Sequence, residues 1–468
     1  MATDIKGFLK VKRSVAGYRP ACERVKDYSQ AALLKADNIC RQQGSRCMDC
    51  STSFCHWGCP VGNYIPEWNE LMSAGHWQKA FELLNASNNL PEITGRLCPA
   101  LCEYACVLGI NDEPVTIREN ELGIIEYAFK NGLIKAHPPK KRSGKKIAVV
   151  GSGPAGLSCA AELNRSGHKV TVFEKDERIG GILRYGIPDF KLEKRVIDRR
   201  LKIWEEEGIV FKTGVNAGVD YPAERLLIDF DAVCLCGGSR KPRDLKIPGR
   251  NLQGIHFAMD YLIQSNKRVA KTQIKPEELI DAKDKKVLVI GGGDTGADCV
   301  GTAHRQGASC VAQIEVLPKP SEKRTSDQPW PKYPAVLRIS SSHEEGGERQ
   351  WSVLTREFLG KDGQVKGVSC IKLDHQMKEV SGSEFLIEAD LVILAIGFLH
   401  PEHEGLLSGL KLQFDSRGNV LADADYKTSV GRVFAAGDMR RGQSLIVWAI
   451  AEGRKAAESI DRYLTSPE

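Results

Sequence analysis

The chain has 468 residues, 42% of them apolar and 27% charged, and a formal net charge of +6. One hydrophobic core is insufficient at this length, so we expect about three domains. No segment approaches the roughly 18 consecutive apolar residues of a membrane-spanning helix, and the small basic excess does not indicate a nucleic-acid partner. We therefore expect neither a membrane nor a nucleic acid among its partners.

Cysteines are concentrated near the N-terminus: nine of the 15 lie within the first 106 residues, and seven of these form two short runs. The runs are Cys47, Cys50, Cys55 and Cys59, which Pro60 follows, and then Cys98, Cys102 and Cys106. Thiolates spaced two to four residues apart can converge on one metal centre, and the first run is typical of a loop that holds an iron–sulfur cluster. Grouped cysteines also disfavour a disulfide framework, so we expect a reducing, cytoplasmic location.

Zinc is the alternative occupant of these cysteines. The pairs Cys47-x2-Cys50 and Cys55-x3-Cys59 could supply four thiolates to a structural zinc ion, and His56 adds an imidazole. The three evenly spaced cysteines of the second run favour iron–sulfur clusters instead. The glycine-rich turns further along the chain, which predict a flavin, also favour iron–sulfur clusters over zinc, because a flavin needs another centre to accept its electrons.

Seven cysteines are one ligand short of two four-cysteine clusters, and Glu121 is the candidate for the eighth. It falls on the apolar stripe of a predicted helix that includes Ile117 and Ile124, where an unpaired carboxylate is costly. An iron ion would compensate the charge, and so would a lysine or arginine at the edge of the stripe; both remain open. Glu119 instead suits a capping box with Thr116.

The predicted domains follow from a change of pattern near residue 146. Residues 1–140 show helical patterns such as 65–84 and no alternating strand, which predicts an all-helical cluster-binding domain. Two strand–glycine turn–helix–strand units then begin at residues 146 and 286. The fold class is therefore α/β, with two Rossmann-like domains after the helical one.

A late strand and turn at residues 432–438 and the helical pattern 445–464 suit a return to the first unit, so that the second unit is inserted in the first. The predicted domains are 1–140 for clusters, 141–280 with 396–468 for FAD, and 281–395 for NAD(P)H.

The first glycine turn is Gly151-x-Gly153-x-x-Gly156, between a strand and a helix. Its glycines allow a tight turn, close approach of a pyrophosphate and close packing of helix on strand, while a strand-end acid suits a ribose hydroxyl. A strand-end aspartate near the C-terminus could hold a ribityl hydroxyl, although alone it would read as an ordinary turn residue. The candidate FAD-binding residues are Gly151, Gly153, Pro154, Ala155, Gly156, Glu174, Gly181, Leu183, Gly437 and Asp438.

The second glycine turn predicts a nicotinamide dinucleotide, because a flavin needs a hydride donor. Glu315 ends the following strand and suits the free ribose hydroxyl of NADH, whereas Lys319, Lys323 and Arg324 could neutralise the additional phosphate of NADPH. The residues leave both nucleotides open. The candidate residues are Gly291, Gly293, Asp294, Thr295, Gly296, Glu315, Lys323 and Arg324.

The cysteines beyond residue 106 contain no Cys-x-x-Cys pair, which disfavours a redox dithiol like that of disulfide reductases. Cys234 and Cys236 lie in an apolar run and are predicted to be core residues. No catalytic side chain is predicted, and electrons are expected to leave through the cysteine-rich domain.

These motifs resemble the small (β) subunits of glutamate synthases over essentially the whole chain. The resemblance includes Cys47-Met48-Asp49-Cys50, the stretch 54–69, the second cysteine run and Gly181-Ile182-Leu183-Arg184-Tyr185-Gly186-Ile187-Pro188. The chain departs from the family at Ser51-Thr52-Ser53, where a glycine and a proline are usual. The departure removes no candidate ligand.

The resemblance implies that NADPH, with NADH as the exception, is oxidised at FAD. Electrons would then pass through two [4Fe–4S] clusters to a large (α) subunit, which makes glutamate from glutamine and 2-oxoglutarate. Similarity to this family and to the N-terminal region of dihydropyrimidine dehydrogenase implies interleaved ligands. One cluster would use Cys47, Cys50, Cys55 and Cys106, and the other Cys59, Cys98, Cys102 and Glu121. The alternative is a related module that serves ferredoxin or reduces a sulfur compound.

Overall fold

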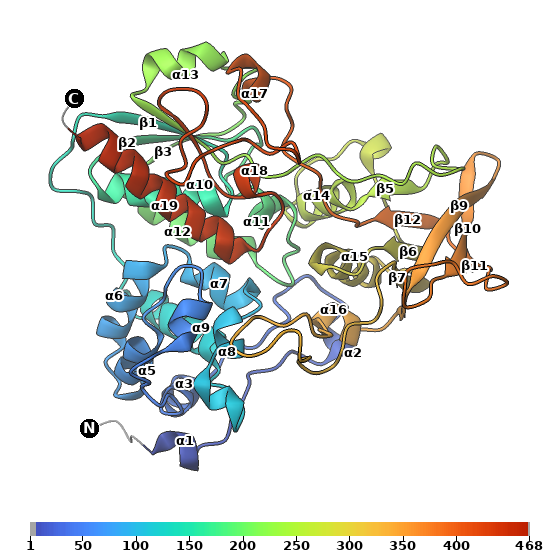
Figure 1. Ribbon diagram of the computed structural model, residues 1–468, viewed down its shortest axis with the longest axis horizontal. Coiled ribbons are helices and arrows are strands. Elements are labelled where there is room, and N and C mark those ends of the chain that lie inside the picture. Colours follow the sequence, from blue (N-terminus) through green and yellow to red (C-terminus); the bar gives the residue numbers. More distant parts are fainter. Residues whose placement is uncertain (1–5, 467–468) are drawn as a thin grey trace.

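A computed structural model describes residues 6–466 of the chain (Figure 1). Figure 1 shows most of the N-terminal helices, in blue and cyan, as one group beside two lobes that each contain a parallel sheet. The all-helical domain followed by two nucleotide-binding domains is thus confirmed.

The N-terminal domain is built from short helices, and the described residues 6–140 contain no strand. Its core includes Trp68, Met72 and Ile124, none of which is exposed. The helical pattern at 65–84 forms two helices, because Gly75 takes a positive φ of 83° between them. The elements are α1 Gly7–Lys10, α2 Ala21–Arg24, α3 Asp37–Gly44, α4 Phe54–Gly58, α5 Ile65–Ser73, α6 Trp77–Ser87, α7 Pro91–Leu97, α8 Leu101–Tyr104, η1 Val107–Ile110 and α9 Ile117–Lys130.

The first sheet has the order β13-β4-β1-β2-β3, and all of its pairs are parallel. Because β13 pairs with β4, the C-terminal segment completes this sheet, as predicted. Its strands are β1 Lys146–Val150, β2 Lys169–Phe173, β3 Val210–Lys212, β4 Ala232–Leu235 and β13 Val433–Ala435. Its helices are α10 Pro154–Arg165, α11 Ile182–Tyr185, α12 Lys194–Glu206, α13 Ala223–Asp229, α17 Leu406–Gly409, α18 Asp438–Arg441 and α19 Ile446–Thr465.

The second sheet has the order β5-β12-β6-β7-β8, is again parallel, and lies in sequence between β4 and β13. Its strands are β5 Ile255–Phe257, β6 Lys286–Ile290, β7 Cys310–Glu315, β8 Glu348–Trp351 and β12 Leu391–Leu394. The helices α14 Ala258–Val269, η2 Pro276–Glu278, α15 Asp294–Arg305 and α16 Ser341–Glu344 belong to the same segment of the chain. An antiparallel sheet of β9 Val353–Lys361, β10 Gln364–Lys372 and β11 Phe385–Glu388 adjoins it.

The membership of β5 bears on the predicted boundary at residue 281. This strand precedes the boundary, yet it pairs with β12 in the second sheet, and α14 packs in the same core. The pairing argues for a boundary before residue 255. A three-residue strand carries too little pattern to reveal this in the sequence.

Candidate functional site

The first glycine turn joins β1 to α10, and its three glycines are required for different reasons. Gly151 has a φ of 102°, and a Cβ there would lie 2.5 Å from the Cys236 carbonyl oxygen. A Cβ at Gly156 would lie 1.9 Å from the Gly151 oxygen, so this glycine lets the helix pack on the turn. At Gly153 nothing lies within 4 Å of that position. The open space at the helix N-terminus fits a pyrophosphate.

Glu174 follows β2 and faces this turn. Its Oε2 accepts hydrogen bonds from the Ser152 amide (3.1 Å) and the Ser152 hydroxyl, and its Oε1 accepts one from the Asp176 amide (2.9 Å). The carboxylate is therefore fixed beside the turn, where the predicted ribose contact requires it. Gly181 also borders the turn, since a Cβ there would lie 3.1 Å from the Gly153 Cα.

Leu183 differs from the other candidates near this turn. The structure buries it completely within the core of the domain.

The C-terminal segment reaches the same turn. A Cβ at Gly437 would lie 2.7 Å from the Ala155 Cβ, and one at Gly453 would lie 2.1 Å from the Ala155 oxygen, so α19 packs closely on α10. Asp438 begins α18 and accepts a hydrogen bond from the Ser444 hydroxyl (2.6 Å). Burial raises the pKa of Asp438 to about 6. Residues nearly 300 positions apart thus enclose one site.

The second glycine turn, between β6 and α15, repeats this geometry. A Cβ at Gly291 would lie 2.2 Å from the Ala395 oxygen and one at Gly296 2.3 Å from the Gly291 oxygen, whereas the position at Gly293 is open. Glu315 ends β7, and its Oε2 accepts a hydrogen bond of 2.5 Å from the Gly292 amide. Gly293 and Asp294 are exposed, so this turn lies open to solvent.

Arg324 and Lys323, the two basic residues predicted to contact a nucleotide phosphate, differ in their hydrogen bonds and exposure. The Arg324 guanidinium donates to the carbonyl oxygens of Gln328 (2.9 Å), Lys332 and Tyr104 (3.1 Å), which commits it to holding residues 316–340 against the helical domain. Lys323 is exposed. Of the two, Lys323 is therefore the one whose charge is available to a ligand.

Four cysteines from both runs line one cavity in the helical domain: Cys47, Cys50, Cys55 and Cys106. Burial raises the pKa of Cys47 to about 12 and raises that of Cys55 as well, and repulsion from neighbouring thiolates, including that of Cys106, adds to both shifts. Coordination to a metal centre would keep such buried thiols deprotonated. The donor set fits an iron–sulfur cluster.

The second group contains the remaining candidate ligands. Burial raises the pKa of Cys59 to about 11 and that of Cys98 to about 12, with a contribution from the neighbouring Glu121 carboxylate in each case. The Cys102 thiol is also buried, and both Cys59 and Cys98 raise its pKa. The structure therefore brings Cys59, Cys98, Cys102 and Glu121 together, apart from the first group.

Glu121 is held by neutral side chains. Its Oε1 accepts hydrogen bonds from Asn88 Nδ2 (2.8 Å), Thr94 Oγ1 (2.9 Å) and Asn63 Nδ2 (3.4 Å), and burial raises its pKa to about 7. Within residues 6–466 no lysine or arginine lies within ion-pair distance of Glu121, which disfavours the alternative of a basic partner. All three hydrogen bonds are accepted by the same oxygen, Oε1, and together they fix the orientation of the Glu121 carboxylate.

Over the same described range, no three His, Cys, Asp or Glu side chains are arranged to bind a single metal ion. A four-iron cluster is larger than one ion, and its ligands surround it at wider spacing.

The predicted capping box of Thr116 and Glu119 was wrong. Thr116 Oγ1 donates to Asn120 Oδ1 (3.0 Å), while the Glu119 carboxylate accepts a hydrogen bond from the Ala16 amide (3.0 Å) and pairs with Lys35 (2.8 Å). The two partners of Glu119 come from the N-terminal segment, far from it in the sequence, so the local pattern does not reveal them.

Cys234 and Cys236 are core residues, as predicted, with exposures of 0% and 5%. Their sulfurs lie 3.6 Å apart although the two residues are not spaced as a Cys-x-x-Cys pair.

Two family models match the chain. The pyridine nucleotide-disulphide oxidoreductase model covers residues 145–453, and the model described as dihydropyrimidine dehydrogenase domain II, 4Fe-4S cluster, covers residues 24–133. The small chain of glutamate synthase [NADPH] from Mycobacterium tuberculosis H37Rv is 54% identical, with 98% of this chain and 96% of that protein covered. The Bacillus subtilis small chain is 46% identical, with 98% of each covered. This chain belongs to the glutamate synthase small-chain family.

Solved structures agree with the fold of the flavin and nucleotide part. FprA from M. tuberculosis in complex with NADPH matches with a TM-score of 0.54 and 18% identity, over 68% of this chain and 84% of that one. Thioredoxin reductase from T. acidophilum matches with a TM-score of 0.50 and 21% identity, over 69% and 100%. At these identities the likeness concerns the fold alone.

Family membership confirms the resemblance drawn from the cysteine runs and glycine turns. The small-chain family is a family of NAD(P)H-dependent flavin oxidoreductases, and this member carries a domain of the 4Fe–4S type. None of the helices in residues 6–466 is long and apolar enough to cross a membrane.

Sequence reasoning missed two parts of the site. Asn63, Asn88 and Thr94 surround Glu121, and the polar stretch Asn85-Ala86-Ser87-Asn88-Asn89 before an apolar helix was the available signal. The segment 316–340 also approaches the cluster cysteines. Its Trp330 ring lies 4.5 Å from Phe54 and its Tyr333 ring 5.2 Å from Tyr104.

Proposed function

We propose that this chain is the small subunit of a cytoplasmic glutamate synthase. It oxidises NADPH at FAD and passes the electrons through two [4Fe–4S] clusters to a large subunit, which makes glutamate from glutamine and 2-oxoglutarate. The observation that carries the proposal is the convergence of Cys47, Cys50, Cys55 and Cys106 on one cavity, in a chain with two glycine turns whose middle glycines, Gly153 and Gly293, face open space.

The flavin supplies a centre that accepts two electrons as hydride and releases them singly to clusters. The side chains around the first turn bind and orient it. Gly153 would leave room for the pyrophosphate, Glu174, fixed beside the turn, would accept a hydrogen bond from a ribose hydroxyl, and Asp438 would hold a ribityl hydroxyl. The packing of α19 on α10 covers one side of this turn.

Two ligand sets support the count of two clusters. Cys47, Cys50, Cys55 and Cys106 hold one cluster, and Cys59, Cys98, Cys102 and Glu121 hold the other. Each set draws on both cysteine runs, so a cluster ties together segments some fifty residues apart. An oxygen ligand at Glu121 favours ferric iron and lowers the reduction potential of that cluster.

The second turn would bind the pyrophosphate of the nicotinamide dinucleotide at the N-terminus of α15, Glu315 would accept a hydrogen bond from the ribose, and Lys323, which is exposed, would neutralise an additional phosphate. Family relatives include enzymes named for NADPH and, in yeasts, for NADH. NADPH is proposed as the principal donor.

The test of the cluster assignment counts iron and acid-labile sulfide in anaerobically reconstituted protein. Cys106→Ser should lose about half of both, because one of the two clusters loses a ligand. Cys22→Ser, at an exposed cysteine outside both ligand sets, is the matched control and should keep the full count. A full count in Cys106→Ser would contradict the assignment.

The test of the activity is anaerobic copurification of the native chain with its partner. Glutamine-dependent NADPH oxidation in the copurified complex is expected. Reduction of ferredoxin without any large subunit would support the alternative module instead.

A further inference from the structure

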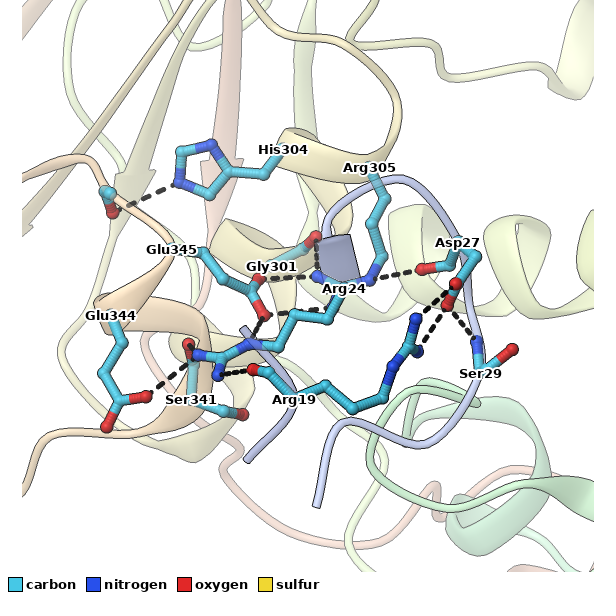
Figure 2. Close-up of polar contacts among 11 residues, drawn as sticks. Arg19, Arg24, Asp27, Ser29, Gly301, His304, Arg305, Ser341, Glu344 and Glu345 are labelled. Atoms are coloured by element: carbon cyan, nitrogen blue, oxygen red, sulfur yellow. Dashed lines mark hydrogen bonds and ion pairs between the residues drawn. The ribbon is translucent and has the colours of Figure 1, made fainter. Parts of the chain in front are cut away.

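The N-terminal segment before α3 crosses from the helical domain to the nucleotide-binding domain. We call residues 19–31, which include α2, the strap. Figure 1 places α2 beside α16, and Figure 2 shows two arginines directed at the carboxylate of Glu345. One of them, Arg24, belongs to the strap, and the other, Arg305, ends α15.

The ion pairs that Arg24 and Arg305 form with Glu345 are buried. The side chains of Arg305 and Glu345 have no exposure, and that of Arg24 has 3%. Arg24 Nε lies 2.7 Å from Glu345 Oε1, while Arg305 donates through Nη1 to Oε2 (2.6 Å) and through Nη2 to Oε1 (3.0 Å). Glu344 pairs with Arg24 at 2.9 Å, which balances the second guanidinium charge. Buried pairs of this kind restrict geometry more than they add stability.

Backbone groups extend the contact along the strap. Arg24 Nη2 donates to the Ser341 oxygen (2.6 Å), and Arg305 Nε donates to the Asp27 oxygen (2.9 Å). Guanidinium groups whose donors all have partners cannot shift without leaving buried groups unpaired. The strap and the nucleotide-binding domain are therefore joined in one arrangement.

The strap is also joined to the flavin domain. The Ala31 amide donates to the Phe190 oxygen (2.8 Å), and the Gln30 amide donates to Glu193 (3.2 Å). Phe190 in turn packs under Arg305, whose Cζ lies 3.8 Å from the ring centroid. A Cβ on Gly301 of α15 would lie 2.9 Å from this ring. Strap, flavin domain and nucleotide domain thus meet at Phe190.

The contact fixes the helix that carries the second glycine turn. α15 begins at Asp294 beside the turn and ends at Arg305 in the ion pair, so holding Arg305 sets the direction of the helix N-terminus. Two chain connections, residues 236–254 and 395–405, link the two sheets. A misplacement of about 1 Å between reacting groups can cost about a hundredfold in rate.

We propose that the strap locks the nucleotide-binding domain onto the flavin domain and that Glu345, with Arg24, is a positioning residue for hydride transfer. The proposal rests on the proposed function in one respect: the reaction that it positions is the reduction of FAD by NAD(P)H. The residues touch neither nucleotide nor flavin, and they act through α15.

The test is anaerobic stopped-flow reduction of the FAD-loaded full chain by NADPH and by NADH. Arg24→Met and Glu345→Gln should lower the limiting rate of flavin reduction about tenfold or more, while the apparent nucleotide Kd changes by less than about twofold. They should also weaken the charge-transfer absorbance between reduced flavin and oxidised nicotinamide, which reports ring stacking. Arg24→Lys keeps the positive charge but lacks the several donors of the planar guanidinium, so its limiting rate should lie between those of Arg24→Met and the wild type.

A matched control is available in Arg200, which forms an equally buried pair with Glu92. The Nε–Oε1 distance is 2.7 Å, and the side-chain exposures are 5% and 0%. This pair joins α12 to α7 and does not involve the nucleotide domain. Arg200→Met should reduce thermal stability as Arg24→Met does, yet keep the wild-type limiting rate.

Wild-type limiting rates and charge-transfer absorbance in both Arg24→Met and Glu345→Gln would overturn the proposal. Should the wild-type chain show no flavin reduction by either nucleotide, the proposed function fails instead. The lock is then decided by amide hydrogen exchange in α15 and α16. Arg24→Met should accelerate this exchange and Arg200→Met should not; equal exchange in the two variants would overturn the lock.

Discussion

The two glycine turns share one backbone design but differ in what surrounds them. Each has a first glycine at positive φ, a middle glycine that faces open space and a strand-end glutamate that accepts a hydrogen bond from a turn amide. At the first turn Gly153 is half-buried and Pro154 is buried, and α19 packs against the next residue, Ala155, whereas at the second turn Gly293 and Asp294 are exposed.

The difference separates a resident cofactor from a passing substrate. A site enclosed by segments far apart in the sequence opens only when the domain loosens, so its ligand is retained between turnovers. An exposed turn allows its ligand to enter and leave without rearrangement. Under the proposed function, the same motif would serve FAD at the first turn and NAD(P)H at the second, because the rest of the chain covers one copy and leaves the other open.

The largest expected effect comes from closing the tightest contact of the first turn. Gly156→Ala places a methyl group 1.9 Å from a backbone oxygen, and we expect a loss of about 4 kcal/mol or more in the free energy of unfolding. Urea unfolding of the flavin-free chain measures it. Gly153→Ala, where the space is open, is the control and should unfold like the wild type; equal stability of both variants would refute the contact.

The open glycines should separate the two ligands. Their φ angles of −69° and −79° suit any residue, so Gly153→Ala and Gly293→Ala should fold normally. The added methyl group obstructs the pyrophosphate at a cost of about 1–3 kcal/mol, or roughly tenfold to two-hundredfold in affinity. Gly153→Ala should weaken FAD binding alone, and Gly293→Ala should weaken nucleotide binding alone. Loss of both ligands in either variant would contradict the separation.

Burial of Asp438 should appear in the pH dependence of the flavin-free chain. Its pKa is about 6 when folded, against 3.8 as the ordinary value, so the folded state binds the proton more tightly. Its contribution to stability is therefore present below pH 4 and is lost as the pH rises through 6. Asp438→Asn should remove this loss and stabilise the flavin-free chain at pH 7 by about 2 kcal/mol.

Thermal unfolding across pH 4–7 checks this expectation. Ser444→Ala removes a hydroxyl that donates a hydrogen bond to the ionised carboxylate of Asp438. The variant should therefore lose more stability than the wild type as the pH rises. An unchanged pH profile in Asp438→Asn would refute the assignment.

The smallest expected effect concerns nucleotide choice at the second turn. Glu315→Gln removes a negative charge beside the ribose, which should raise kcat/KM for NADPH relative to NADH by about tenfold. Steady-state dye reduction with each nucleotide measures the ratio. Glu174→Gln is the matched change at the first turn and should lower flavin content without moving the ratio. A shift of the ratio in that variant would mean that the two turns are not independent.

The sequence predicts well those parts of the molecule that depend on neighbouring residues. The glycine turns, their strands and the return of the C-terminal segment follow from short patterns, and the structure brings the cysteine runs together as expected. Long-range contacts carry no such pattern. The asparagines around Glu121, the Lys35 partner of Glu119 and the Arg24–Glu345 pair join residues up to 321 positions apart. For this reason the capping box predicted from the local sequence, Thr116 with Glu119, was wrong.

The insertion of one sheet within another imposes an order on biosynthesis. On the ribosome, β4 emerges long before β13, its neighbour in the finished sheet, and the interval is about 10–40 s at ordinary elongation rates. During this time the first sheet has an unpaired edge, while the inserted domain can already fold. A nascent chain truncated before residue 433 should therefore bind chaperones through that edge and acquire flavin only after release.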